Sequence, residues 1–194
     1  SDTRTSKLDL ASGQNALKCY YNGRSDEDVV LGWLDDPTTG SVKLIDNDND
    51  DEYEYVLVSQ FTSHAVVGDI DATTSTLEGK NNADIDIDIE DENVITRFFA
   101  ADGSAIGFED IEVGDVISIM KSTDEALVMA YISKEVVEGK VTEEKPDAND
   151  DFGYTIGDKE YKIALDGDGS AVISLSVGTE GKFFLNVEGR IVAK

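Results

Sequence analysis

The sequence predicts an all-β protein. Apolar residues alternate with polar ones or form short blocks, and Gly, Asn and Asp interrupt them at intervals of roughly 8 to 12 residues, the spacing typical of β-sandwiches and β-barrels. Helical periodicity is weak, and a hydrophobic content of 40% is enough for a packed core. We expect mostly antiparallel strands in a larger sandwich or barrel-like domain over residues 1–135. A small β-barrel (SH3- or OB-like) is expected over residues 136–194.

The first predicted domain begins with a polar segment over residues 1–16. The strands expected after it are Leu17–Tyr21, Val29–Leu34, Ser41–Ile45, Tyr53–Phe61, Ala65–Ile70, Ala83–Ile89, Val94–Ala100, Val116–Met120 and Leu127–Ile132.

The clearest of these strands is Ala83–Ile89, in which isoleucines alternate with Asp84, Asp86 and Asp88. Neighbours on one face of a strand lie about 6.6–6.8 Å apart, too far for three carboxylates to share one ion. These aspartates therefore predict the solvated face of an edge strand, whose charge opposes edge-to-edge aggregation.

In the second predicted domain, a polar loop at Glu143–Asp151 contains Pro146, and the pair Gly157-Asp158 predicts a tight hairpin. The strands expected there are Val136–Thr142, Phe152–Ile156, Glu160–Ala164, Ala171–Val177, Lys182–Val187 and Arg190–Ala193.

A short pattern occurs in both predicted domains. Asp102-Gly103-Ser104-Ala105 precedes Val113-Gly114 and two strands, and Asp168-Gly169-Ser170-Ala171 precedes Val177-Gly178 and two strands. A repeated hairpin unit would explain the match, and so would ordinary turn chemistry.

The charge of the chain limits its partners. With 42 acidic and 16 basic residues the formal net charge is −26, which repels nucleic acids and anionic membranes and favours cations. Solubility alone or a halophilic origin would also explain this acidity. Cys19 is the single cysteine, so an intramolecular disulfide is excluded. No apolar run approaches 18 residues, so we expect no membrane insertion.

The acidic segment 46–54 is the candidate metal site. Asp46, Asp48, Asp50 and Glu54 take positions 1, 3, 5 and 9 of a calcium-binding loop. An EF-hand is excluded because the twelfth position is Leu57, and Asp51 stands where glycine permits the sharp turn. A shorter calcium loop between two strands and a solvated hairpin tip both stay open. Asp166 and Asp168 form a second, smaller candidate.

Catalysis has little support, and we expect no enzyme. His64 is the single histidine, and no Ser-His or Cys-His pattern surrounds it. A hydrolase with paired carboxylates is an alternative that sequence alone does not test. The aromatic residues of the first 60 positions could stack on carbohydrate or pack in the core, and they are Tyr20, Tyr21, Trp33, Tyr53 and Tyr55.

Five sequence segments together resemble a known group of proteins. They are residues 20–23, 40–56, 111–118, 137–141 and 156–162. In this order they resemble the β-rich extracellular regions that accompany S-layer homology (SLH) domains in cell-surface proteins of clostridia and related Firmicutes. The SLH repeat itself is not recognisable, and the acidic loop departs from the pattern at Asp51 and Glu54.

The resemblance implies an extracellular location at the cell surface or cell wall. The chain shows no signal peptide and begins with Ser1-Asp2, so we expect a mature or trimmed fragment. The resemblance also implies a structural, spacer or adhesion role, with a cell-wall polymer or other surface proteins as partners. A module that binds carbohydrate or wall polymer is the alternative within this class.

Overall fold

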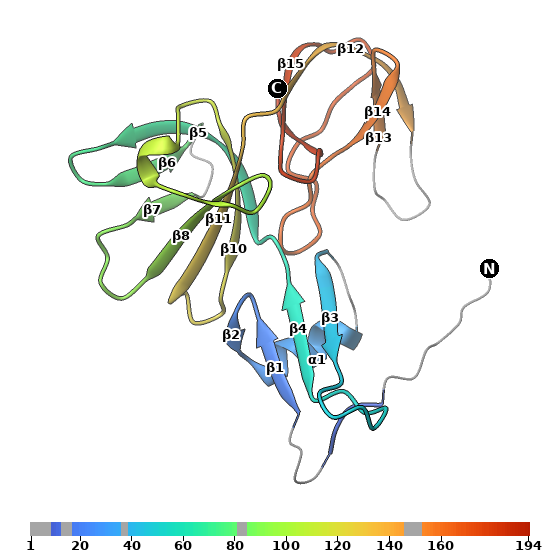
Figure 1. Cartoon of the computed structure of the whole chain (residues 1–194). Helices are drawn as coiled ribbons and strands as arrows, with labels where there is room; N and C mark the ends of the chain where they lie inside the picture. The colour runs from blue at the N-terminus through green and yellow to red at the C-terminus, as the bar shows by residue number, and fades with distance from the viewer. Residues whose placement is uncertain (1–8, 13–16, 36–38, 81–84, 146–152) are drawn as a thin grey trace. The chain divides into compact units, whose positions relative to one another are not determined.

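The chain forms two compact units, residues 1–60 and 61–194. The computed structural model describes residues 9–12, 17–35, 39–80, 85–145 and 153–194 (Figure 1). These residues form three β-sheets and one α-helix, and most strand pairs are antiparallel. The prediction of an all-β, mostly antiparallel fold is therefore confirmed.

The first unit is a four-stranded sheet with the strand order β2-β1-β4-β3. Its core consists of buried side chains from β1, β4 and the helix α1, with Leu10 packed beside them. The two central strands, β1 and β4, run parallel. The bounds of the strands are β1 (Lys18–Tyr21), β2 (Arg24–Ser25), β3 (Ser41–Ile45) and β4 (Tyr55–Ser59).

Helix α1 (Glu27–Asp35) replaces the strand predicted at Val29–Leu34, so that prediction was wrong. The carboxylate of Asp26 accepts a hydrogen bond from the backbone N–H of Val29 at 3.1 Å, which is an N-cap interaction. Acidic residues in the first turn favour the helix N-terminus. The apolar side chains of α1 pack against β1 and β4. A short apolar block fits either a strand or a buried helix, and the prediction assigned it to a strand.

The second unit contains a seven-stranded sheet with the strand order β7-β6-β5-β10-β11-β8-β9. The strands are β5 (Ser63–Asp71), β6 (Thr76–Gly79), β7 (Asp86–Asp88), β8 (Ile95–Ala100), β9 (Ala105–Ile106), β10 (Val116–Lys121) and β11 (Leu127–Ser133), with the 3-10 helix η2 (Phe108–Asp110) before β10. As predicted, β7 is an edge strand, with Ile85 and Ile87 buried and Asp88 exposed. Asp84 lies outside the described residues.

A five-stranded sheet with the strand order β14-β13-β12-β15-β16 completes the second unit. Its strands are β12 (Val136–Lys145), β13 (Gly153–Ile156), β14 (Lys159–Lys162), β15 (Glu180–Leu185) and β16 (Ile191–Ala193). The predicted hairpin is confirmed, because Ile156 pairs with Lys159 across Gly157-Asp158. Most of the predicted polar loop, including Pro146, lies outside the described residues.

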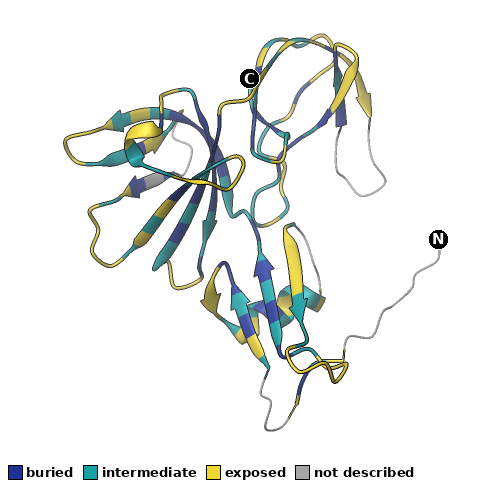
Figure 2. Ribbon diagram, in the orientation of Figure 1, coloured by how far each residue is buried: buried dark blue, intermediate teal, exposed yellow. Residues whose placement is uncertain are grey.

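Over the described residues no sheet closes into a barrel. The chain just after β14 meets β16 only at one bridge, between Ile163 and Ile191. The predicted small barrel is therefore an open, curled sheet. Figure 2 shows buried residues in all three sheets, with exposed residues at their turns and edges.

The sequence pattern noted at Asp102 and Asp168 belongs to a repeated fold within the second unit. We call residues 61–133 the first copy and residues 136–194 the second copy. Each copy starts with a long strand, β5 or β12, that carries a bulge and pairs with two different neighbours. In the first copy Gly114 donates to the carbonyl of Val67 at 2.9 Å, and the Val67 N–H donates to the carbonyl of Asp115 at 2.8 Å.

The second copy makes the same pair of bonds at the equivalent residues. Gly178 donates to the carbonyl of Val141 at 2.8 Å, and Val141 donates to the carbonyl of Thr179 at 2.7 Å. Gly114 and Gly178 have φ angles of 101° and 98°. Residues other than glycine rarely adopt this backbone conformation.

The turns named in the sequence also match. Ala100 donates to the Ser104 carbonyl at 2.8 Å in the first copy, and Asp166 donates to the Ser170 carbonyl at 3.0 Å in the second. Turn chemistry at one position does not produce matching bonds at distant positions, so the repeat is an architectural feature of this unit.

The predicted domains, residues 1–135 and 136–194, differ from the compact units and stay a prediction. The boundary predicted near residue 135 coincides in sequence with the junction between the two copies. No helix in the described part of the chain is long and apolar enough to cross a membrane.

Candidate metal centre

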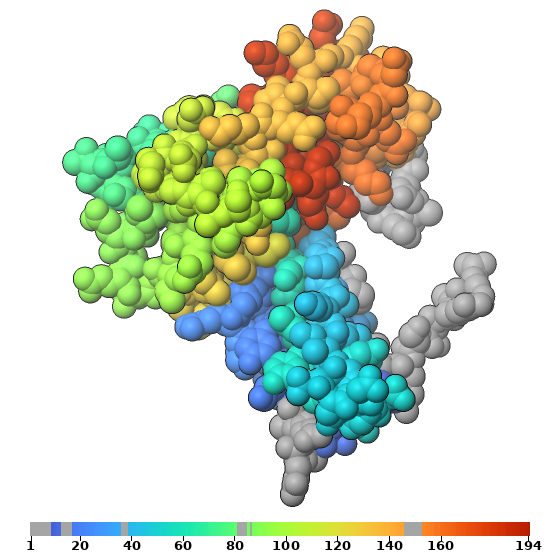
Figure 3. Space-filling view, in the orientation of Figure 1, coloured from blue at the N-terminus to red at the C-terminus, as the bar shows by residue number. Residues whose placement is uncertain are grey.

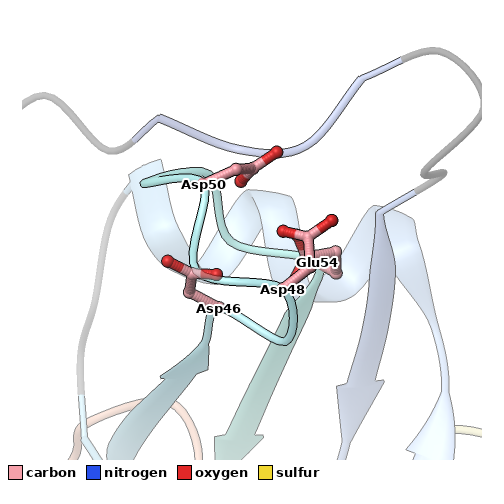
Figure 4. Close-up of side chains that lie close together, drawn as sticks. All are labelled: Asp46, Asp48, Asp50 and Glu54. Carbon is pink, nitrogen blue, oxygen red and sulfur yellow. The ribbon is translucent and has the colours of Figure 1, made fainter.

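The acidic loop, residues 46–54, connects β3 to β4 in the first unit (Figure 4). In the space-filling view this part of the chain lies on the visible surface (Figure 3). Asp46, Asp48, Asp50 and Glu54 each offer one carboxylate oxygen, and these four oxygens all lie within 4.8 Å of one another. The structure therefore brings together all four residues that the sequence pattern singled out. Asp48 and Asp50 are exposed, Asp46 is half-buried and Glu54 is buried.

Backbone hydrogen bonds to the carboxylates fold the loop. Asp46 accepts from the N–H groups of Asn49 at 2.5 Å and Asp51 at 3.2 Å. Asp50 accepts from the N–H of Glu52 at 3.0 Å. Such side-chain-to-backbone bonds are the usual way in which aspartate stabilises tight turns.

The sharp turn forms without glycine. Asn49 and Asp51 adopt φ angles of 63° and 71°, in the left-handed region that Asn and Asp enter more readily than other side chains. Asp51 stands where glycine was expected to permit the sharp turn, and the structure shows that the loop turns there with Asp51 in place. Asparagine and aspartate do here what glycine does elsewhere.

Glu54 differs from the other three because its side chain is buried. The residue is 9% exposed, and its Oε2 accepts a hydrogen bond from the N–H of Asn47 at 2.6 Å. Its Oε1 is buried and has no hydrogen-bond partner. A buried charged oxygen without a partner is costly, so this atom is suited to a cation.

Within the described residues no Lys or Arg forms an ion pair with the four carboxylates. The pKa of Asp48 is raised, first by lost hydration and then by the negative charges of Asp50, Glu54 and Asp46. Among the residues that the structure describes, no ion pair offsets this repulsion, and a bound cation would reduce it.

The geometry suits calcium. Calcium binds six to eight oxygens at about 2.3–2.6 Å, so two oxygens on one ion are at most about 5 Å apart. The four carboxylate oxygens meet that limit. With fewer protein oxygens than calcium requires, the remaining positions would fall to backbone carbonyls or water.

The second acidic candidate is weaker. The carboxylates of Asp166 and Asp168 both accept from the N–H of Ser170, at 2.9 and 2.8 Å. The pKa of Asp168 is lowered, first by a hydrogen bond from the Ser170 side chain, whereas the pKa of Asp166 is raised, first by burial. These two acids therefore serve a turn, and no third acidic or histidine ligand joins them in the described chain.

The single histidine lies in the core of the second unit. His64 Nδ1 and Ser118 Oγ are 2.8 Å apart on the paired strands β5 and β10. Sequence reasoning missed this pair, because 54 residues separate its members. Ser118 is fully buried, so its hydroxyl is out of reach of a substrate in this structure, and the pair connects two strands.

Of the five aromatic residues considered for carbohydrate stacking, Tyr21 is buried and the other four are half-buried. Tyr21 donates to Gln60 Oε1 at 2.8 Å, and the Trp33 ring N–H donates to the Thr39 carbonyl at 3.0 Å. These contacts support the packing interpretation for those two residues.

Comparison with known proteins gives one partial likeness. Residues of this chain are 28% identical over 137 positions to the middle cell wall protein of Brevibacillus brevis (strain 47), a match that covers 65% of this chain and 13% of that protein. No protein-family model matches the chain. No solved structure matches it either. The chain is thus similar to a small part of a bacterial cell-wall protein, and the more specific resemblance to SLH-associated regions stays a prediction.

Proposed function

We propose that this chain is a non-catalytic structural module of a bacterial cell-surface protein, and that calcium bound by the acidic loop stabilises its first unit. The observation that carries the calcium proposal is the buried, unpartnered Oε1 of Glu54 within a group of four close carboxylates. The partial likeness to a cell-wall protein supports the cell-surface role. Spacer and adhesion roles both fit a module of this kind, with wall polymer or other surface proteins as partners.

The stabilisation comes from a difference in affinity. Folding brings the four carboxylates together, whereas the unfolded chain holds them apart, so calcium binds the folded state more tightly. A ligand at about 50 times its dissociation constant stabilises the folded state by about 2 kcal/mol. For a unit of this size that corresponds to a rise in melting temperature on the order of 10 °C.

Thermal melting tests the proposal. Trp33, the single tryptophan, lies in α1 of the first unit, so its fluorescence follows that unit. Melting temperatures are compared in chelator, in millimolar calcium and in matched magnesium. We expect a rise specific to calcium that Asp48→Asn abolishes. The control Asp28→Asn makes the same charge change on an exposed residue of α1 and keeps the rise. Equal melting temperatures in calcium and chelator would exclude the calcium site, and a rise with molar sodium chloride alone would indicate a halophilic adaptation.

Binding of a wall polymer is a second candidate, and an aromatic group in the second unit favours it. The rings of Phe99 and Tyr131 stack with centroids 5.0 Å apart, and Phe61 meets Tyr131 edge-on at 5.7 Å. All three are half-buried, and aromatic rings of this kind stack on sugars. Co-sedimentation with purified cell walls tests it. We expect Tyr131→Ala to reduce binding, whereas equal binding by both proteins would exclude this surface.

The hydrolase alternative also stays a proposal. It requires two carboxylates that flank a scissile bond at glycosidase spacing. A screen of wall polysaccharides for released reducing sugar tests it, and the absence of turnover across the screen would remove it.

A further inference from the structure

The two residues that end the acidic loop also hold the N-terminal part of the first unit. We call residues 9–11 the strap. The Tyr53 N–H donates to the Asp9 carbonyl at 2.9 Å, and the Ala11 N–H donates to the Tyr53 carbonyl at 3.0 Å. Together these bonds form a parallel bridge between Leu10 and Tyr53. In Figure 4 the strap crosses beside the acidic loop.

The backbone of Glu54, the residue after Tyr53, is also hydrogen-bonded to the first strand. Its carbonyl accepts from the N–H of Lys18, the first residue of β1, at 2.8 Å. Its own N–H donates to the carbonyl of Ile45, the last residue of β3, at 3.1 Å. The backbone of Glu54 therefore joins β1 and β3 at the base of the loop, while its side chain belongs to the carboxylate group.

The strap is part of the core and not a surface tail. Ala11 is 7% exposed, and Leu10 packs against the core of the first unit. Docking of the strap thus buries apolar surface, and two backbone hydrogen bonds to Tyr53 hold its backbone. Short attachments of this kind open locally at a small fraction of the global unfolding free energy.

We propose that calcium binding at the acidic loop locks the strap onto the first unit. A cation held by the Glu54 carboxylate restricts the Glu54 side chain, and through it the backbone of Tyr53 and Glu54 that carries the bonds to Asp9, Ala11 and Lys18. Loss of the cation leaves four mutually repelling carboxylates beside that backbone, so the strap opens more often. This inference rests on the proposed calcium site and adds a mechanical consequence to it.

Native-state amide hydrogen exchange measures this coupling residue by residue. The amides of Ala11 and Tyr53 report on the strap, and that of Lys18 reports on the bond between β1 and Glu54. The amide of Asn22, bonded to Val58 at 3.0 Å, reports on the core of the same unit. If opening of the strap requires release of calcium, calcium at 50 times its dissociation constant slows exchange of the strap amides by about 50-fold. We expect Asp50→Asn to abolish this slowing and Asp28→Asn to preserve it.

The outcomes separate the inference from the function on which it rests. Calorimetry of calcium binding runs beside the exchange experiment. Binding with slower exchange at Ala11, Lys18 and Tyr53 supports the lock. Binding that leaves those three amides unchanged overturns the lock and leaves the calcium site in place. Slowing of the same size in Asp50→Asn also overturns the lock, and no binding overturns both.

Discussion

Acidification should destabilise the second unit through His64. The residue is 9% exposed, and burial lowers its pKa from 6.5 to about 4, with a further lowering by the charge of Arg190 and an opposing hydrogen bond to the backbone of Leu165. His64 lines a surface pocket together with Lys80 and Lys194, which are also cationic. Folding therefore favours the neutral ring, whereas the unfolded chain takes up a proton as the pH falls below about 6.5.

The sign and size of the effect follow from these two pKa values. A folded-state pKa below the unfolded value means that the stability is present above pH 6.5 and is lost as the pH falls towards 4. One pKa unit corresponds to about 1.36 kcal/mol, so the full loss is about 3 kcal/mol. Between pH 7.5 and pH 5 the expected loss is about 2 kcal/mol.

Two measurements test this reasoning. Because His64 is the single histidine, its imidazole protons give an unambiguous NMR titration, and we expect a midpoint near pH 4. Urea unfolding of the natural chain and of His64→Gln at pH 7.5 and pH 5 then isolates its contribution from that of the carboxylates. A midpoint at or above 6.5, or the same pH dependence in both proteins, would refute the reasoning.

The remaining predictions concern packing and turns, and urea unfolding checks each. Phe183→Ala removes a fully buried ring, and we expect a loss of about 3–5 kcal/mol, whereas a loss below 1 kcal/mol would mean that the ring is not in the core. Tyr21→Phe leaves Gln60 Oε1 without the hydroxyl that it now accepts from, so we expect a loss of about 1–2 kcal/mol. Gly32→Ala adds a methyl group in α1 where nothing lies within 4 Å and should stabilise by about 0.5–1 kcal/mol. Gly114→Ala has similar space but a φ of 101°, so it should destabilise by about 1–2 kcal/mol. Effects of equal sign in the two glycine variants would contradict this account.

The elements that depend on residues close together in the sequence could be predicted from local sequence patterns. Alternation predicted β7 as an edge strand, since one of its faces had to be charged. The pair Gly157-Asp158 predicted a hairpin because few other dipeptides fit a two-residue turn. The acidic loop was also predictable, because its four ligand candidates lie within nine residues and a turn brings such residues together.

Features that depend on distant partners were not predictable. The parallel pairs β1–β4 and β8–β11 join strands far apart in the sequence. Val29–Leu34 is as apolar as a strand, and its docking against β1 and β4 adds to the Asp26 N-cap in favouring the helix. The burial of Glu54 was equally hidden, since a run of acids in sequence does not show which one faces inward.

The repeat in the second unit helps to separate acids that serve turns from acids that could bind a metal. Asp102 in the first copy and Asp168 in the second occupy equivalent turns, where each accepts from the N–H of a serine two residues later, at 2.9 and 2.8 Å. Both have a lowered pKa, first because of a hydrogen bond from the side chain of that serine and further because of this backbone bond. Their negative charge is already stabilised by the turn itself.

In the acidic loop the neighbours of Asp48 act on its pKa in the opposite direction. The pKa of Asp48 is raised by lost hydration and by its acidic neighbours, and Glu54 Oε1 is buried without a hydrogen-bond donor. The acidic neighbours of Asp48 therefore act against its ionised form, and the calcium ion that we propose for this loop would offset that repulsion.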